Sequence, residues 1–149
     1  MAVSSSSTLS TRFLIISDTH NFEFGDTPTD TSLLQLLPAK ADEFLHCGDL
    51  THCGGELSYK KAPKMLGAID AEMKLVIAGN HDLDPDKPHW NTHLDEGDRP
   101  EDHNLAMEAM KGDLAAEAGV TYLEEGTNTF TLNEQSQFHH LRIAIRTSI

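Results

Sequence analysis

The chain of 149 residues carries 11 Lys and Arg against 24 Asp and Glu, a formal net charge of −13. This length supports one domain with a substantial core, and 38% hydrophobic with 23% charged residues is typical of a soluble globular protein. An acidic balance without any Lys- or Arg-rich run argues against duplex nucleic acid as a partner. It does not exclude a phosphate ester, because bound metal ions can reverse the sign of the local field.

The N-terminus and the cysteines bear on location. Residues 1–11 are rich in Ser and lack the apolar centre of a signal peptide, so we expect a disordered tail before one domain over residues 12–149. No segment approaches the ~20 apolar residues that span a bilayer, so we expect no membrane association. Cys47 and Cys53 form neither a disulfide framework nor a CxxC motif, which favours reduced thiols in a cytoplasmic protein.

Three short apolar runs are typical of buried strands. Each is followed closely by a polar residue or a glycine, and they cover residues 13–17, 43–47 and 74–78.

Helices are predicted between and after these runs. The first covers residues 31–37, and the second covers residues 56–70 and either starts late or kinks at Pro63. A third is expected to begin with Asp102 as its N-cap and to be closed by Gly119.

Two more strands, at residues 120–132 and 138–145, are expected to form a hairpin or meander. Residues 83–101 form a long polar loop. The resulting order, β-α-β-α-β-α-β-β, predicts an α/β fold with at least three central parallel strands flanked by helices.

Polar side chains follow each of the first three strands. Because the carboxyl ends of parallel strands lie at one edge of a sheet, these side chains are predicted to meet in one crevice. The three blocks are Asp18-Thr19-His20, Gly48-Asp49 and Gly79-Asn80-His81-Asp82.

The residue types in these blocks suit metal ions. Asp18 and His20 are two positions apart and can share one ion, while Asp49 has two oxygens and can bridge two ions. Asn80 offers a neutral carbonyl oxygen to the second ion. Carboxylate, amide and imidazole together favour Mn²⁺, Zn²⁺ or Fe, and two such ions can activate a bridging water.

In order and spacing, the blocks resemble the signature D-x-H, G-D and G-N-H-[D/E] of the calcineurin-like metallophosphoesterase family. The segments HCGDLTHCGGELSYKKAP and KLVIAGNHDLDPD look most like its branch of metallophosphoesterase-domain-containing proteins, and the resemblance covers about residues 12–145. It implies part of a metallophosphoesterase sandwich. It also implies hydrolysis of phosphomono- or phosphodiesters, small nucleotides included, by a metal-activated hydroxide at a dinuclear site.

The resemblance also assigns roles. Asp18 and His20 would hold the first metal, Asp49 would bridge both, and Asn80 would bind the second. His81 would act on the phosphoryl group, by protonating the leaving oxygen or by neutralising its charge. The adjacent Asp82 is expected to orient neighbouring backbone or His81 rather than to touch metal.

Two further blocks of the family, a lone His and a G-H-x-H, find no counterpart here. His139 and His140 are adjacent on a predicted strand and point to opposite faces, so they are not expected to be ligands. The chain therefore resembles the N-terminal part of the family domain without its C-terminal strands. The alternative to the enzyme is a truncated, non-catalytic pseudoenzyme or fragment that holds one ion or none and acts through binding.

Four further residues lie near the blocks or in the long loop. His46 is predicted to be structural. His52 and Cys53 follow Asp49 closely, and two alternatives stay open for them: they line the site or they lie outside it. Trp90 is predicted to pin the long loop to the body rather than to stack on a substrate ring.

Overall fold

A computed structural model describes residues 10–23, 40–85, 99, 101–134 and 137–145. Within them, β1 (Phe13–Ile16), β2 (Ala41–His46), β3 (Ala71–Val76) and β4 (Val120–Tyr122) form a parallel sheet in the order β1-β2-β3-β4. The predicted α/β class with central parallel strands is confirmed. The strand expected at residues 120–132 is divided, because its first part joins this sheet as β4.

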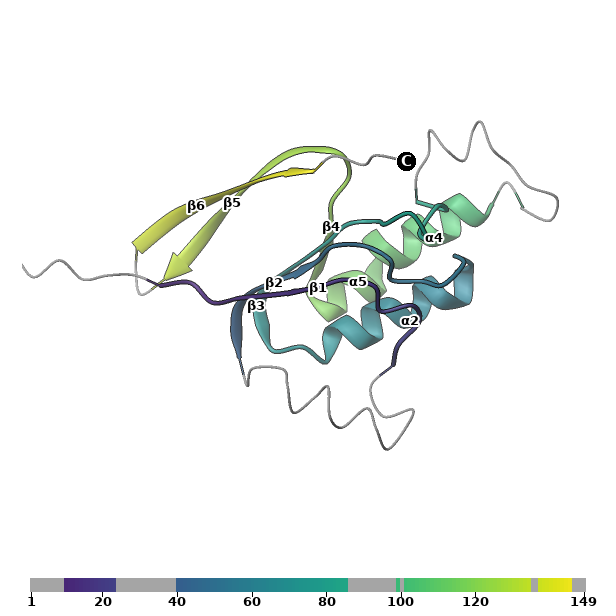
Figure 1. Ribbon diagram of the computed structural model, residues 1–149, viewed down its shortest axis with the longest axis horizontal. Helices are drawn as coiled ribbons and strands as arrows, with labels where there is room; N and C mark the ends of the chain where they lie inside the picture. Colours follow the sequence, from purple (N-terminus) through teal and green to yellow (C-terminus); the bar gives the residue numbers. More distant parts are fainter. Residues whose placement is uncertain (1–9, 24–39, 86–98, 100, 135–136, 146–149) are drawn as a thin grey trace, which may run out of the picture.

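The helices cover one face of the sheet (Figure 1). They are α2 (Glu56–Gly67), α4 (Asp102–Lys111) and α5 (Asp113–Ala118). The main core lies between them and the sheet and includes Phe44 from β2 and Leu66 from α2, both 0% exposed.

The second helix continues through Pro63, from Glu56 to Gly67, so the expectation of a late start is wrong. Proline lacks the N–H that a helix interior uses and is unfavourable there by ~3 kcal/mol. The Pro63 ring is fully buried beside Met65 and Leu66, and this apolar burial offsets the lost hydrogen bond.

The third predicted helix is in fact two helices, which meet at Gly112. A Cβ at Gly112 would lie 2.4 Å from Glu108 Oε1 and 2.5 Å from the Glu108 carbonyl oxygen, so a side chain does not fit where α4 ends. Gly119 closes α5 in the left-handed conformation, with φ 69°, as expected. The N-cap is Glu101 rather than Asp102, whose carboxylate instead accepts hydrogen bonds from the backbone N–H and the guanidinium of Arg99.

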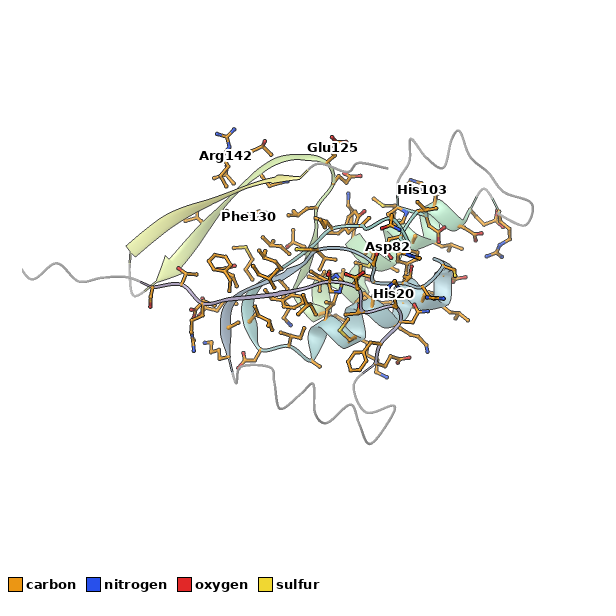
Figure 2. All side chains as sticks on the ribbon, viewed as in Figure 1. His20, Asp82, His103, Glu125, Phe130 and Arg142 are labelled. Carbon is orange, nitrogen blue, oxygen red and sulfur yellow. The ribbon has the colours of Figure 1, made fainter. Side chains whose placement is uncertain are left out.

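The opposite face of the sheet carries a smaller apolar cluster and the predicted hairpin, β5 (Gly126–Glu134) antiparallel to β6 (Gln137–Ile145). Phe130 of β5 packs against the cluster that contains Leu75 and Leu123 (Figure 2). The first strand is not buried as expected. It lies at the sheet edge, and Phe13 and Ile15 are 43% and 58% exposed.

Several expectations lie outside the described residues: most of the tail at residues 1–11, the helix at 31–37, most of the loop at 83–101 with Trp90, and the side chains of His139 and His140. The helices that the structure does describe are too short and too polar to cross a membrane.

Candidate metal centre

The loops that follow β1 and β2 run side by side at the carboxyl edge of the sheet. The backbone N–H of Asp18 donates to the carbonyl of Gly48 at 3.0 Å, and that of His20 donates to the carbonyl of Asp49 at 3.1 Å. These bonds continue the strand pairing beyond the sheet. They bring the first two polar blocks together, as the strand ends predicted.

Glycines allow the loop after β3 to approach equally closely. Gly48 has φ 99°, and a Cβ there would lie 2.6 Å from the Cα of Gly79. A Cβ on Gly79 would lie 2.1 Å from Asp49 Oδ1. Real Cβ atoms do not come so close, so both blocks need the glycine that precedes their polar residue.

The backbone at this edge is strained. Asp18, His20, Asn21 and Asp49 have φ between 44° and 64°, a left-handed conformation that non-glycine residues rarely adopt. Each such residue costs on the order of 1–2 kcal/mol. Strain of this kind persists where surrounding interactions hold the chain in place, and it is concentrated at functional sites.

Asp82 supplies the interactions that hold the loop after Asp49 against Gly79. Its side chain is fully buried and accepts hydrogen bonds from the backbone N–H groups of Leu50 (2.9 Å), Thr51 (2.8 Å) and Gly79 (3.1 Å). The Thr51 hydroxyl donates to Asp82 Oδ1 at 2.8 Å. The expectation that Asp82 orients neighbouring backbone is therefore confirmed. Its hydrogen bonds connect the loop of the second block to that of the third.

Three side chains converge at this edge: His20, Asp49 and His81 each offer a ligand atom, and these atoms lie within 4.8 Å of one another. Bonds from a metal ion to these ligands are ~2.0–2.2 Å long. The three side chains would therefore move slightly toward one another when they bind one ion. Asp18 stands beside the group, with Oδ1 3.9 Å from His20 Nε2. Asn80 is exposed in the turn between Gly79 and His81.

The structure also brings His81 into this group, although the sequence predicts metal ligands only at Asp18, His20, Asp49 and Asn80 and gives His81 a role on the phosphoryl group. In the described residues a ligand atom of His81 lies within 4.8 Å of those of His20 and Asp49, and the His81 ring centroid lies 4.9 Å from that of His20.

Backbone carbonyls determine which ring nitrogen of each histidine faces the centre. His20 Nδ1 lies 3.1 Å from the Thr51 carbonyl oxygen, and His81 Nδ1 lies 2.9 Å from the His52 carbonyl oxygen. A carbonyl oxygen can only accept, so both Nδ1 atoms donate. In the neutral rings both Nε2 atoms then carry a lone pair, which is the state that binds a metal.

The hydrogen-bond partners of His46 give its ring the opposite tautomer, with the proton on Nε2. The Gly48 N–H donates to His46 Nδ1 at 3.3 Å, so Nε2 holds the proton and donates to Thr19 Oγ1 at 3.0 Å. Burial lowers the pKa of His46 to about 4. The ring is neutral and structural, as predicted. It bonds Thr19 of the first polar block and Gly48 of the second.

Sequence reasoning missed the part played by residues 51 and 52. Thr51 is fully buried and contributes its N–H, hydroxyl and carbonyl groups to the site, and His52 contributes its carbonyl. The contacts to His20 and His81 come from main-chain carbonyls, which every residue has. The residue types at positions 51 and 52 therefore do not reveal these contacts. The one available sign was that both residues follow Asp49 closely.

Comparisons with known proteins find a matching family model and similar relatives. The family model described as "Calcineurin-like phosphoesterase" matches residues 11–141. Metallophosphoesterase domain-containing protein 1 of Homo sapiens, and equally that of Mus musculus, is 38% identical over 73 residues, which are 49% of this chain and 19% of the relative. A UPF0046 protein of Caenorhabditis elegans is 36% identical over 74 residues, 48% of this chain and 23% of the relative. The chain therefore aligns with about a fifth of the length of these relatives.

Proposed function

This chain belongs to the calcineurin-like phosphoesterase family, and we propose that it hydrolyses phosphomono- or phosphodiesters with divalent metal ions bound at the carboxyl edge of its sheet. The observation that carries the proposal is the convergence of His20, Asp49 and His81 on one centre. Imidazole and carboxylate groups suit Mn²⁺, Zn²⁺ or Fe, so the donor set fits the ions that the family implies.

Four side chains would hold the ions: Asp18 and His20 the first, Asp49 both, and Asn80 the second. When bound, the ions supply Lewis acidity that activates a water and neutralises charge on the phosphoryl oxygens. Asp49 Oδ1 accepts the backbone N–H of His81 at 3.0 Å, which orients the carboxylate. This bond also ties the proposed bridging ligand to the proposed acid.

His81 would protonate the leaving ester oxygen. Its Nδ1 stays bonded to the His52 carbonyl, so the proton that moves is the one on Nε2. After transfer the neutral ring keeps its orientation, because the Nδ1 hydrogen bond is unchanged. The same geometry allows a charged His81 to neutralise a phosphoryl oxygen without transferring a proton.

The substrate that we propose is a small phosphate ester or nucleotide. With a net charge of −13, the chain disfavours duplex nucleic acid. Cys47 and Cys53 are both free thiols, which supports our proposal of a cytoplasmic location.

Hydrolysis of an aryl phosphate in the presence of Mn²⁺ tests the proposal. Asp49→Asn keeps the side-chain shape but weakens a metal ligand, and we expect hydrolysis to fall by about 100-fold or more. Asp42→Asn is the matched control. Asp42 lies near the start of β2, the strand that precedes Asp49, and pairs with Arg12, so its substitution should leave the rate unchanged. Equal rates for Asp49→Asn and the unsubstituted chain would exclude this mechanism.

A binding protein without catalysis is the second candidate. It is favoured by the described ligand atoms of His20, Asp49 and His81, which converge on one centre and so could hold one ion. Elemental analysis of the purified chain separates the two: two ions per chain support the dinuclear enzyme, whereas one ion without hydrolysis supports the binding protein.

A further inference from the structure

The site contains a third imidazole, and we propose that the side chain of His52 binds the phosphoryl group of the substrate. The inference rests on the proposed phosphoesterase function and adds to it a substrate-binding residue that the signature blocks do not include.

The His52 ring borders the same centre as the two histidines of the cluster. Its centroid lies 5.5 Å from that of His20, with the rings at 81°, and 6.1 Å from that of His81, with the rings nearly parallel at 14°. His20 and His81 are themselves 4.9 Å apart. The three rings therefore form one group, and the His52 side chain is exposed.

The main chain that carries His52 is firmly held. Thr51, the preceding residue, is bonded to Asp82 through its N–H and its hydroxyl, both at 2.8 Å, and its hydroxyl oxygen accepts the Gly54 N–H at 2.9 Å. The carbonyl oxygens of Thr51 and His52 orient the rings of His20 and His81. One rigid segment thus positions two rings of the group and supplies the third.

Hydrogen bonding distinguishes His52 from the neighbouring histidines. His20, His46, His81 and His103 each have a ring nitrogen bonded to a protein group. Within the described part of the chain, neither ring nitrogen of His52 has such a bond. Because a neutral imidazole always carries one N–H, His52 can donate to a phosphoryl oxygen without a change of protonation state.

Most of the described cations pair with other protein groups. Six of them pair with carboxylates of residues outside the ring group: Arg12, Lys40, Lys60, Lys61, Arg99 and Lys111. Lys74 is buried and donates to the carbonyls of Gly67 and Ala118. Imidazole N–H groups of the ring group can therefore donate to the phosphoryl oxygens that metal does not contact.

The test is calorimetric titration of inorganic phosphate into the whole chain loaded with Mn²⁺, after a separate titration of Mn²⁺. We expect His52→Ala to weaken phosphate binding by about tenfold or more, because a hydrogen bond to a charged group is lost. Mn²⁺ affinity should stay within about twofold, which also shows that the site remains folded. His52→Gln, which keeps an N–H donor, should recover part of the loss.

Cys53→Ser is the matched control, since it alters the adjacent exposed side chain of the same segment. It should change neither titration. Unchanged phosphate affinity in His52→Ala would overturn the inference and leave the proposed function standing, and so would a parallel loss of Mn²⁺ affinity, which would make His52 a metal ligand. If the unsubstituted chain binds no Mn²⁺, the proposed function itself fails, and this inference with it.

Discussion

The helical layer and the carboxyl edge of the sheet are held together by different interactions. Helices α2, α4 and α5 pack on the sheet through apolar side chains such as Tyr59, Leu66 and Met110, all 0% exposed. The carboxyl edge instead consists of left-handed loop residues and close glycines, joined by hydrogen bonds to one buried carboxylate. Apolar packing supplies stability, whereas the polar network holds a strained backbone in the arrangement that brings His20, Asp49 and His81 together.

The sharpest test of this contrast is Asp82→Ala. The change leaves buried N–H groups of Leu50 and Thr51 without an acceptor, so we expect the free energy of unfolding to fall by about 3–5 kcal/mol. Mn²⁺ binding should be lost as well, because the second and third blocks separate. Denaturant unfolding and a Mn²⁺ titration measure the two effects.

Leu66→Ala is the comparison in the helical layer. It should cost about 2–5 kcal/mol by creating a cavity, yet Mn²⁺ affinity in the folded protein should not change. If both substitutions lowered stability equally and neither altered Mn²⁺ binding, the two regions would not differ as described.

Acid should weaken the carboxyl edge through His46. Its folded pKa of about 4 lies below its unfolded value of 6.5, so the unfolded chain binds a proton that the folded chain does not. Stability from this group is therefore fully present above pH 6.5 and decreases as the pH falls toward 4, by roughly 3 kcal/mol in total.

Denaturant unfolding of the metal-free chain between pH 7 and 4.5 checks this sign. His46→Gln removes the titrating group, so its stability should decrease less steeply with acid than that of the unsubstituted chain. Parallel curves for the two proteins would contradict a buried, neutral His46.

The smallest expected effect concerns Gly119, where α5 ends with φ 69°. No atom lies within 4 Å of a Cβ built there, so Gly119→Ala tests backbone conformation without a clash. We expect a loss of about 1 kcal/mol. Gly67→Ala, at the end of α2, is the control and should be neutral or stabilising by up to about 1 kcal/mol, since its Cβ would meet Ala118 Cβ at an ordinary 3.4 Å. Similar losses at both positions would argue against the left-handed cap.

Local sequence patterns predicted the type of most helices and strands in the described residues. They did not predict where each element begins and ends or how exposed it is. The apolar runs predicted β2 and β3, which lie at Ala41–His46 and Ala71–Val76, two or three residues earlier at their start than expected. The exposure of β1 was missed because an apolar run does not reveal whether the strand has one neighbour or two. The break at Gly112, where the backbone has φ −84° and ψ −158°, was missed because a glycine inside a helical pattern does not by itself show whether the helix continues.

For the site, residue types in order along the chain were the useful signal. They placed Asp18, His20, Asp49 and His81 at one sheet edge, where the structure has them, and they assigned Asp82 to the backbone. The Thr51 and His52 carbonyls, which orient the rings of His20 and His81, left no comparable pattern.

The sequence by itself determined the α/β class with central parallel strands, the family, and the edge of the sheet where the polar groups gather. These features depend on apolar periodicity and on side-chain chemistry, both of which residue identity records directly. The tertiary structure decided which histidine nitrogen faces the centre, how Asp82 holds the loops together, and that His52 stands beside His20 and His81. These depend on hydrogen bonds and ring contacts between loops that are distant in the chain, and main-chain atoms are the same in every residue.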